Sequence, residues 1–294
     1  MTMSTLKIWI DATRPKTLPA AAAPVIMGSA MAFNDGLLHL PAALAALFGA
    51  LLIQIGTNFA NDYFDYIKGA DTKERLGPTR ATQAGLVKPS IMKMAFILTF
   101  LLAFIIGLYL IYRGGWPLFF IGILSILLGI LYTGGPYPLG YNGLADIFVL
   151  IFFGPVAVGG TYYVQALEIN QVVLLAGLAP GLISMAILTV NNLRDIHTDA
   201  KAGKRTLAVR FGAGFARQEY LLSLIAACLL PLLLVYLTQE NFYSVLTLFA
   251  LIPAVPGIKL VFTGISGPPL NQVLADTGRL LFLYSIIFSL GWIF

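Results

Sequence analysis

Aspartate and asparagine side chains are concentrated in two segments of this 294-residue chain. The first segment holds Asn58, Asn61, Asp62 and Asp65, and the second holds Asn191, Asn192, Asp195 and Asp199. When Asn58 is aligned with Asn191, Asp62 is also aligned with Asp195. Residues three and four positions apart lie on the same face of a helix. The spacing therefore predicts that Asn58, Asp62 and Asp65 project together from one helix end. It predicts the same of Asn191, Asp195 and Asp199 at a second helix end.

Carboxylates crowded on one helix face repel one another and need a cation, especially near a bilayer, where desolvating them is costly. A set of oxygen donors without His or Cys suits Mg²⁺, or Mn²⁺, rather than Zn²⁺. We therefore predict that the metal ligands and catalytic acids are Asp62, Asp65, Asp195 and Asp199, with Asp71 as a further metal ligand. Because Mg²⁺ shares its coordination with substrate phosphates, two such sets would suit a diphosphate.

Basic residues follow both acidic segments. We predict that they bind the same substrate: Lys73 and Arg80 after the first segment, and Lys201, Lys204 and Arg205 after the second. Lys and Arg, together with a metal ion, stabilise a departing phosphate. The asparagines Asn58, Asn61, Asn191 and Asn192 would complete or orient the shell. A single loop of this kind is equally explained as a solvated, salt-bridged connector. Two copies at matching helix ends favour the functional interpretation.

The rest of the chain is a membrane sequence, with 59% hydrophobic and 11% charged residues. Soluble domains average about 25% charged residues. A soluble enzyme, a disordered chain and a nucleic-acid-binding module are therefore disfavoured, and the single Cys228 excludes an intrachain disulfide. Nine stretches approach the roughly 20 apolar residues of a membrane-spanning helix. They predict an all-α integral membrane protein with one domain, 1–294, and spans at 18–33, 41–60, 91–112, 116–133, 144–164, 172–190, 215–237, 242–262 and 280–294.

The positive charges predict how this domain is oriented. Of the 18 Lys and Arg residues, all but Arg113 lie before the first span or in and beside the loops that follow even-numbered spans. In an alternating path these loops are all on one side of the membrane, and Arg113 is on the opposite side. Cytoplasmic loops retain Lys and Arg. We therefore expect a cytoplasmic N-terminus, an external C-terminus, and a cytoplasmic polar cap made of loops 66–90 and 191–214. This rule also explains the net charge of +5 without a nucleic-acid partner.

Several of these residues resemble the UbiA-type intramembrane aromatic prenyltransferases. Residues 61–65 resemble the first aspartate-rich motif of that family, and residues 191–199 resemble the second. The blocks at 9–18, 71–88, 132–141 and 203–209 are similar to members that act on 1,4-dihydroxy-2-naphthoate in menaquinone synthesis. The resemblance covers about the first three-quarters of the chain, and the last three predicted spans match in hydropathy alone.

The resemblance implies nine helices around a central cavity in a bacterial cytoplasmic (inner) membrane, with the active site toward the cytoplasm. It also implies Mg²⁺-dependent transfer of a polyprenyl chain from an allylic polyprenyl diphosphate to 1,4-dihydroxy-2-naphthoate. Carbon dioxide and diphosphate would be lost, giving demethylmenaquinone. The resemblance implies no obligate protein partner. The alternatives are another aromatic acid such as 4-hydroxybenzoate, or a secondary transporter, although a transporter normally has its charged site at the bilayer midplane.

Two departures from the broader family bear on this interpretation. Gly69 stands where many members have a third acid, so a ligand role for Asp71 follows less directly. The segment from Tyr137 to Asn142 lacks the cation that 4-hydroxybenzoate relatives often carry, which favours the naphthoate.

Two groups of residues have open assignments. One or more of four tyrosines would stabilise an allylic cation through the ring face, or serve as interfacial anchors: Tyr63, Tyr132, Tyr137 and Tyr141. Arg14 and Lys16 would meet the acceptor carboxylate, or follow the positive-inside rule.

Overall fold

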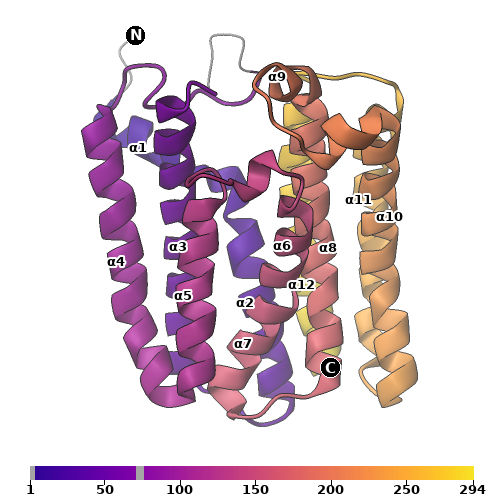
Figure 1. The fold of residues 1–294 in the computed structure, drawn as a ribbon. Coiled ribbons are helices and arrows are strands. Elements are labelled where there is room, and N and C mark those ends of the chain that lie inside the picture. The colour runs from indigo at the N-terminus through magenta and orange to yellow at the C-terminus, as the bar shows by residue number, and fades with distance from the viewer. Residues whose placement is uncertain (1–3, 71–75) are drawn as a thin grey trace.

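A computed structural model describes residues 4–70 and 76–294, and long helices running side by side form one bundle (Figure 1). The short helices α1 and α9 lie at one end of the bundle, which we call the cap end. The C-terminus lies at the opposite end, which we call the floor end (Figure 1). The helices in chain order are α1 (Thr5–Thr13), η1 (Pro15–Thr17), α2 (Pro19–Asn34), α3 (Leu40–Ile67), α4 (Pro89–Gly114), α5 (Trp116–Leu131), η2 (Leu139–Tyr141), α6 (Ala145–Phe152), α7 (Pro155–Ala166), α8 (Gln171–Arg194), α9 (Ile196–Lys201), α10 (Leu207–Thr238), η3 (Phe242–Ala250), α11 (Leu251–Phe262) and α12 (Leu270–Ile293).

Seven helical stretches of the described residues are long and apolar enough to cross a membrane. They are Leu40–Ile67, Pro89–Gly114, Ala145–Ala166, Gln171–Arg194, Leu207–Thr238, Phe242–Phe262 and Leu270–Ile293. The helices at the other two predicted spans, α2 and α5, have 16 residues each, which is fewer than a perpendicular span needs. The prediction of an all-α chain with several membrane-crossing helices is confirmed. Seven of the nine predicted spans have the required length and hydropathy.

Three of the predicted spans differ in the structure from single regular helices. The stretch 144–164 forms two helices, α6 and α7, because the chain leaves helical geometry at Gly154 and Pro155 lacks a backbone N–H. Helix α10 begins at Leu207 rather than at 215 and bends at Gly212, where φ is 84°. The stretch 242–262 begins as the 3₁₀ helix η3 and continues as α11.

The helix ends that carry polar residues extend beyond the apolar runs. Helix α3 continues to Ile67 and α8 to Arg194, so both acidic segments lie on or beside ordered helix ends. Helix α12 begins at Leu270, ten residues before the predicted position. Hydropathy does not detect its first turns because they contain Asn271, Gln272 and Asp276. Part of the predicted loop 191–214 is therefore helical, as the end of α8, α9 and the start of α10.

Besides a small cluster of Ala42, Leu118 and Val164, two apolar clusters hold the bundle together. The larger one joins α2, α7, α8, α10, α11 and α12, with the fully buried Met27, Tyr162, Ile183 and Phe288 among its members. The smaller one joins α1, α3 and α4 around Phe59, Phe96 and Phe100. Each acidic segment thus projects from a separately packed part of the bundle.

Candidate active site

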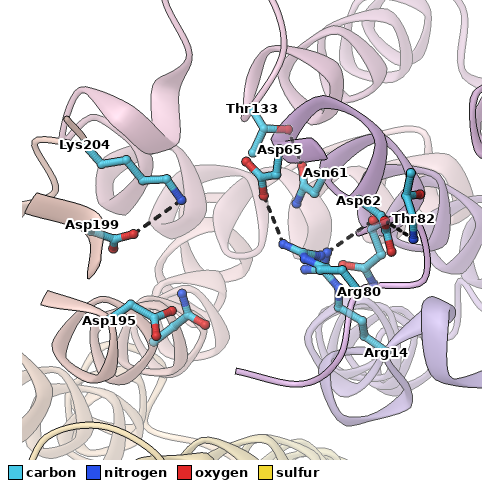
Figure 2. Close-up of polar contacts among 12 residues, drawn as sticks. Arg14, Asn61, Asp62, Asp65, Arg80, Thr82, Thr133, Asp195, Asp199 and Lys204 are labelled. Carbon is cyan, nitrogen blue, oxygen red and sulfur yellow. Dashed lines mark hydrogen bonds and ion pairs between the residues drawn. The ribbon is translucent and has the colours of Figure 1, made fainter. Parts of the chain in front are cut away.

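A cavity of about 420 Å³ lies inside the bundle, and both acidic segments line it. Its walls along α2, α4, α5, α6 and α7 are mostly apolar. Its cap end is polar: Asn58, Asn61 and Asp65 come from the end of α3, while Asn191, Asp195 and Asp199 come from α8 and α9. The polar groups of the two segments face each other across the cavity mouth (Figure 2).

On the α3 wall, Asp65 is held by an arginine and a tyrosine. The carboxylate is almost fully buried, and it accepts hydrogen bonds from Arg80 Nη2 at 3.0 Å and from the Tyr141 hydroxyl at 2.8 Å. Arg80 is buried as well, so the two form an ion pair shielded from water. Removing one partner of such a pair leaves an uncompensated buried charge. Arg80 therefore provides the positive charge that is paired with the buried Asp65 carboxylate.

Asp62 has a different environment. Its two carboxylate oxygens accept hydrogen bonds from the backbone N–H groups of Ala81 and Thr82, at 2.9 and 3.0 Å, and Asp62 is not among the residues that line the cavity. Of the three residues predicted to project together, Asn58 and Asp65 line the cavity with Asn61, whereas Asp62 binds the loop. A metal-binding role for Asp62 stays a prediction.

The chain between α1 and η1 forms the rim next to this wall. Arg14 adopts a left-handed conformation with φ of 53°, and its Nη2 donates to the Asn58 carbonyl at 3.2 Å. In return, the Asn58 side-chain amide donates to the Thr13 carbonyl at 2.8 Å. Asn61 accepts a hydrogen bond from the Thr133 hydroxyl at 2.9 Å. These contacts place the Arg14 guanidinium in the cavity lining.

On the α8 wall, the fully buried Arg194 organises the second segment. Its Nε and Nη2 donate to the two carboxylate oxygens of Asp195, and Nη2 also donates to the Asn191 side-chain oxygen at 2.8 Å. A paired fork of this kind fixes the plane of the carboxylate as well as its charge. Arg194 therefore sets the direction in which Asp195 faces the cavity.

Asp199 and Lys204 complete the mouth of the cavity. The two side chains form an ion pair at 3.3 Å. Burial raises the pKa of the Asp199 carboxyl, and the Lys204 ammonium opposes that rise. Lys204 Nζ also lies 4.8 Å from the centre of the Tyr141 ring, and Lys68 Nζ lies 5.2 Å from it. Tyr141 thus links the two walls, because its hydroxyl binds Asp65 and its ring contacts the partner of Asp199.

The structure gathers most of the predicted site residues. Those that line the cavity are Arg14, Asn58, Asn61, Asp65, Arg80, Tyr132, Asn191, Asn192, Asp195, Asp199 and Lys204. Four others, Lys16, Tyr137, Lys201 and Arg205, have exposed side chains outside this lining, and Tyr137 is 61% exposed. Asp71 and Lys73 lie outside the described residues.

The donor chemistry of the mouth fits a magnesium ion shared with a phosphate. Among residues 4–70 and 76–294, no three His, Cys, Asp or Glu side chains are grouped closely enough to form a metal cage. Mg²⁺ does not need one, since it commonly takes one or two carboxylates and fills its other positions with water and substrate phosphate oxygens. Asp65 on one wall and Asp195 and Asp199 on the other supply that kind of set.

Residues 21–265 match the UbiA prenyltransferase family. The chain belongs to this family. Its relatives include the 1,4-dihydroxy-2-naphthoate octaprenyltransferase of Haemophilus influenzae, at 40% identity over 97% of this chain and 96% of that protein. The enzyme of the same name from Escherichia coli is 42% identical over 84% and 80%, respectively.

The fold is shared with solved UbiA structures. A UbiA homologue from Archaeoglobus fulgidus superimposes with a TM-score of 0.68 at 13% identity, covering 97% of this chain and 99% of that one. The same homologue bound to DMAPP and Mg²⁺ gives a TM-score of 0.63 at 14% identity, covering 96% and 99%. At these identities the likeness concerns the fold.

Sequence reasoning missed three contacts that organise the site of this UbiA family member. Arg194 was counted only as a topological charge, although an arginine directly before Asp195 at the end of an apolar helix was the available signal. Tyr141 was considered for cation stabilisation and not as a partner of Asp65. Asn271, which binds Arg194 at 2.8 Å, lies in the part of the chain where no motif was visible.

Proposed function

We propose that this UbiA family protein transfers a polyprenyl chain from an allylic polyprenyl diphosphate to 1,4-dihydroxy-2-naphthoate. The observation that carries the proposal is the cavity itself, which is apolar along its length and ringed at one end by carboxylates, amides and cations. Such a cavity suits a substrate with a long apolar tail and a charged head. The choice of acceptor rests on the names of the relatives at about 40% identity.

The mouth would hold the diphosphate. Asp65, Asp195 and Asp199 are the proposed magnesium ligands, with Asn61, Asn191 and Asn192 as neighbouring oxygen donors. Bound Mg²⁺ would offset the negative charge that develops on the departing diphosphate. Arg80 and Lys204 line the same mouth, so each would exchange part of its contact with a carboxylate for a phosphate oxygen. In the present arrangement Asp62 holds the loop, and we assign it a positioning role.

The reaction would take place just below the mouth. The bond between the allylic carbon and the diphosphate oxygen breaks, and its electron pair leaves with the diphosphate. The ring carbon that bears the carboxylate bonds to the allylic carbon, and the carboxylate then leaves as CO₂ while its bonding electrons restore the aromatic ring. The product is the hydroquinone form of demethylmenaquinone.

Two residues at the mouth have proposed roles in this step. The ring face of Tyr132 lines the cavity and would stabilise the positive charge at the allylic carbon. Arg14 is placed to hold the acceptor carboxylate from the rim.

We also propose nine spans with the cap end in the cytoplasm. Sixteen residues of α-helix rise about 24 Å, so α2 and α5 nearly cross a hydrocarbon core of about 30 Å. Both helices line the cavity beside longer ones. The site would then open toward the cytoplasm of a bacterial inner membrane, where soluble acceptor is available.

The test uses purified protein in detergent with labelled polyprenyl diphosphate, Mg²⁺ and a choice of aromatic acids. We expect prenylated product from 1,4-dihydroxy-2-naphthoate, loss of that product after chelation with EDTA, and recovery on adding back Mg²⁺ or Mn²⁺. Product from 4-hydroxybenzoate alone would overturn the acceptor assignment. Ion-coupled uptake by proteoliposomes without any transfer would overturn the enzymatic one.

A further inference from the structure

One side chain of the last helix contacts both halves of the cap. Asn271 lies in the first turn of α12, and its side-chain oxygen accepts a hydrogen bond from Arg194 Nη1 at 2.8 Å. The amide nitrogen of the same side chain donates to the Leu76 carbonyl at 3.0 Å. Both functional atoms of this amide are therefore used, one toward α8 and one toward the segment that leads into α4.

The first of these contacts fixes the second acidic segment. Arg194 is 2% exposed, and its Nε and Nη2 hold Asp195 and Asn191. The guanidinium is planar and rigid, so a partner at Nη1 determines the orientation of the other donors. Asn271 is that partner, and it therefore acts on Asp195 through Arg194.

The second contact fixes the segment that closes over the first acidic segment. Leu76 also packs beside Gly267 in the turn before α12. Four residues later Arg80 pairs with Asp65, and the next two backbone N–H groups bind Asp62. This segment, residues 76–82, therefore runs from α12 to the end of α3, and it is anchored at both ends.

We propose that Asn271 is a positioning residue that holds the two acidic segments in a fixed position relative to each other. It orients Asp195 through Arg194 and anchors residues 76–82 over Asp62 and Asp65. The inference rests on the proposed function in one respect, namely that both segments bind one diphosphate. Asn271 contacts neither the diphosphate nor the reacting carbon, and its effect is on how well the two walls match a single ligand.

The experiment compares Asn271→Ala, Asn271→Asp and the control Gln272→Ala. Gln272 is the exposed neighbour of Asn271 and bonds to Asp276 on its own helix. Alanine removes both contacts of Asn271. Aspartate keeps an acceptor for Arg194 but has no donor for the Leu76 carbonyl, so it separates the two contacts. Binding of inorganic pyrophosphate with Mg²⁺ is measured by calorimetry, and hydrogen exchange is followed in peptides covering 76–82 and 191–199.

We expect Asn271→Ala to weaken pyrophosphate binding about 10-fold or more, as removal of a partner behind a ligand does. It should speed exchange in both peptides, whereas Asn271→Asp should speed exchange in 76–82 alone. Gln272→Ala should match the wild type. Under prenyl-transfer conditions, Asn271→Ala should raise KM for the diphosphate substrate more than it lowers kcat.

Two outcomes separate this inference from the proposed function. If Asn271→Ala matches Gln272→Ala in both exchange and binding, the positioning role is overturned, whatever the acceptor. If the wild type neither binds pyrophosphate with Mg²⁺ nor transfers a prenyl group, the proposed function fails, and the exchange data still test the anchoring of residues 76–82. Thermal unfolding of each variant shows whether it has folded. If Asn271→Ala has not folded, Asn271→Asp, which keeps the Arg194 contact, is compared with Gln272→Ala in its place.

Discussion

The aspartates of the two acidic segments differ in what holds them. Asp65, Asp195 and Asp199 are each paired with a cationic side chain. Two of these cations, Arg80 and Lys204, line the cavity themselves. Asp62 is bound by two backbone N–H groups, which cannot leave without unfolding the loop. At the residue scale, this difference supports the proposal that Asp65, Asp195 and Asp199 bind a metal ion while Asp62 positions the loop.

Substituting these acids separately tests that distinction. Asp65→Asn removes a proposed metal ligand and should reduce transfer about 100-fold or more, with little change in unfolding temperature. Asp62→Asn places an amide against one of two buried N–H donors and should destabilise the fold by about 1–3 kcal/mol. Transfer assays and thermal unfolding in detergent measure both effects. Equal losses of activity without loss of stability would return Asp62 to the metal site.

The Asp199–Lys204 pair makes the activity depend on pH in a defined direction. Burial raises the pKa of Asp199 and Lys204 opposes that rise, so removing the ammonium in Lys204→Ala should raise it further. Asp199 must be ionised to bind a metal, and activity is lost as the pH falls through its pKa. The midpoint of the acid limb of kcat/KM should therefore move to higher pH in Lys204→Ala.

Lys259→Ala, which removes a distant exposed cation from α11, is the control for that experiment. Its acid limb should coincide with that of the wild type. A midpoint in Lys204→Ala that stays in place or moves to lower pH would show that Asp199 does not govern this limb.

The residue types of the site could be predicted from the sequence, but their partners could not. Oxygen donors at helix ends in an apolar chain predict Asp62, Asp65, Asp195 and Asp199 as site residues, and all but Asp62 line the cavity. The separation of Asp62 from the cavity depends on where the amides of Ala81 and Thr82 lie, and that is set by a loop crossing. Arg194 and Asn271 meet only because α8 and α12 pack together, a contact that spacing along the chain does not reveal.

At the scale of the elements, glycines set how closely α6 and α8 approach. A Cβ at Gly181 of α8 would lie 2.3 Å from the Leu150 carbonyl oxygen of α6 and 3.1 Å from the Gly154 Cα. Gly177, one turn earlier on α8, faces the backbone of Pro155 in the same way. The break between α6 and α7 is therefore packed directly on α8, which holds the wall of Asn191 and Asp195 against the cavity.

Gly181→Ala tests this packing. The added methyl group would force the helix backbones apart, which costs about 1–3 kcal/mol in a tightly packed interior. We expect a lower unfolding temperature and a loss of transfer that follows the shift of α8. Gly214→Ala is the matched control, because a Cβ there meets nothing within 4 Å. A wild-type unfolding temperature for Gly181→Ala would contradict the close approach.

Hydropathy predicted the long elements well and their interruptions poorly. The apolar runs of α4 and α8 are nearly continuous, and their ends lie within four residues of the predicted ones. The α6–α7 break and the 3₁₀ turn of η3 lie inside runs that are equally apolar. The amphipathic helix α1 has nine residues, too few for a membrane span, so a search for spans does not predict it. Its Trp9 packs edge-on against Phe59 and anchors the rim.

At the scale of the whole molecule, the two ends of the bundle differ. The cap end holds the polar mouth of the cavity, and hydrogen bonds join the helices at the floor end. At the floor end, Arg113 caps the last turn of α7 by donating to the Val164 and Gln165 carbonyls at 2.6 and 3.0 Å. A cation is favourable at a helix C-terminus. Gln165 in turn accepts from the His39 backbone N–H and donates to Ser29. The lone cation predicted on that side is thus explained by a local structural role.

This asymmetry predicts which surfaces face which compartment. In a Cys228→Ala background, single cysteines are placed at exposed positions: Ala202 and Tyr137 at the cap end, and Glu168 and Leu38 on floor-end connections. With most Lys and Arg at the cap end, that end should be cytoplasmic. A membrane-impermeant maleimide should therefore label the cap-end cysteines in inside-out vesicles and the floor-end cysteines in right-side-out vesicles.

Leu38→Cys and Tyr137→Cys also test whether the short helices span the membrane, because α2 and α5 must cross it to place these two cysteines on opposite sides. Labelling of Leu38→Cys together with Ala202→Cys would show that α2 does not span, and a complete reversal would overturn the orientation.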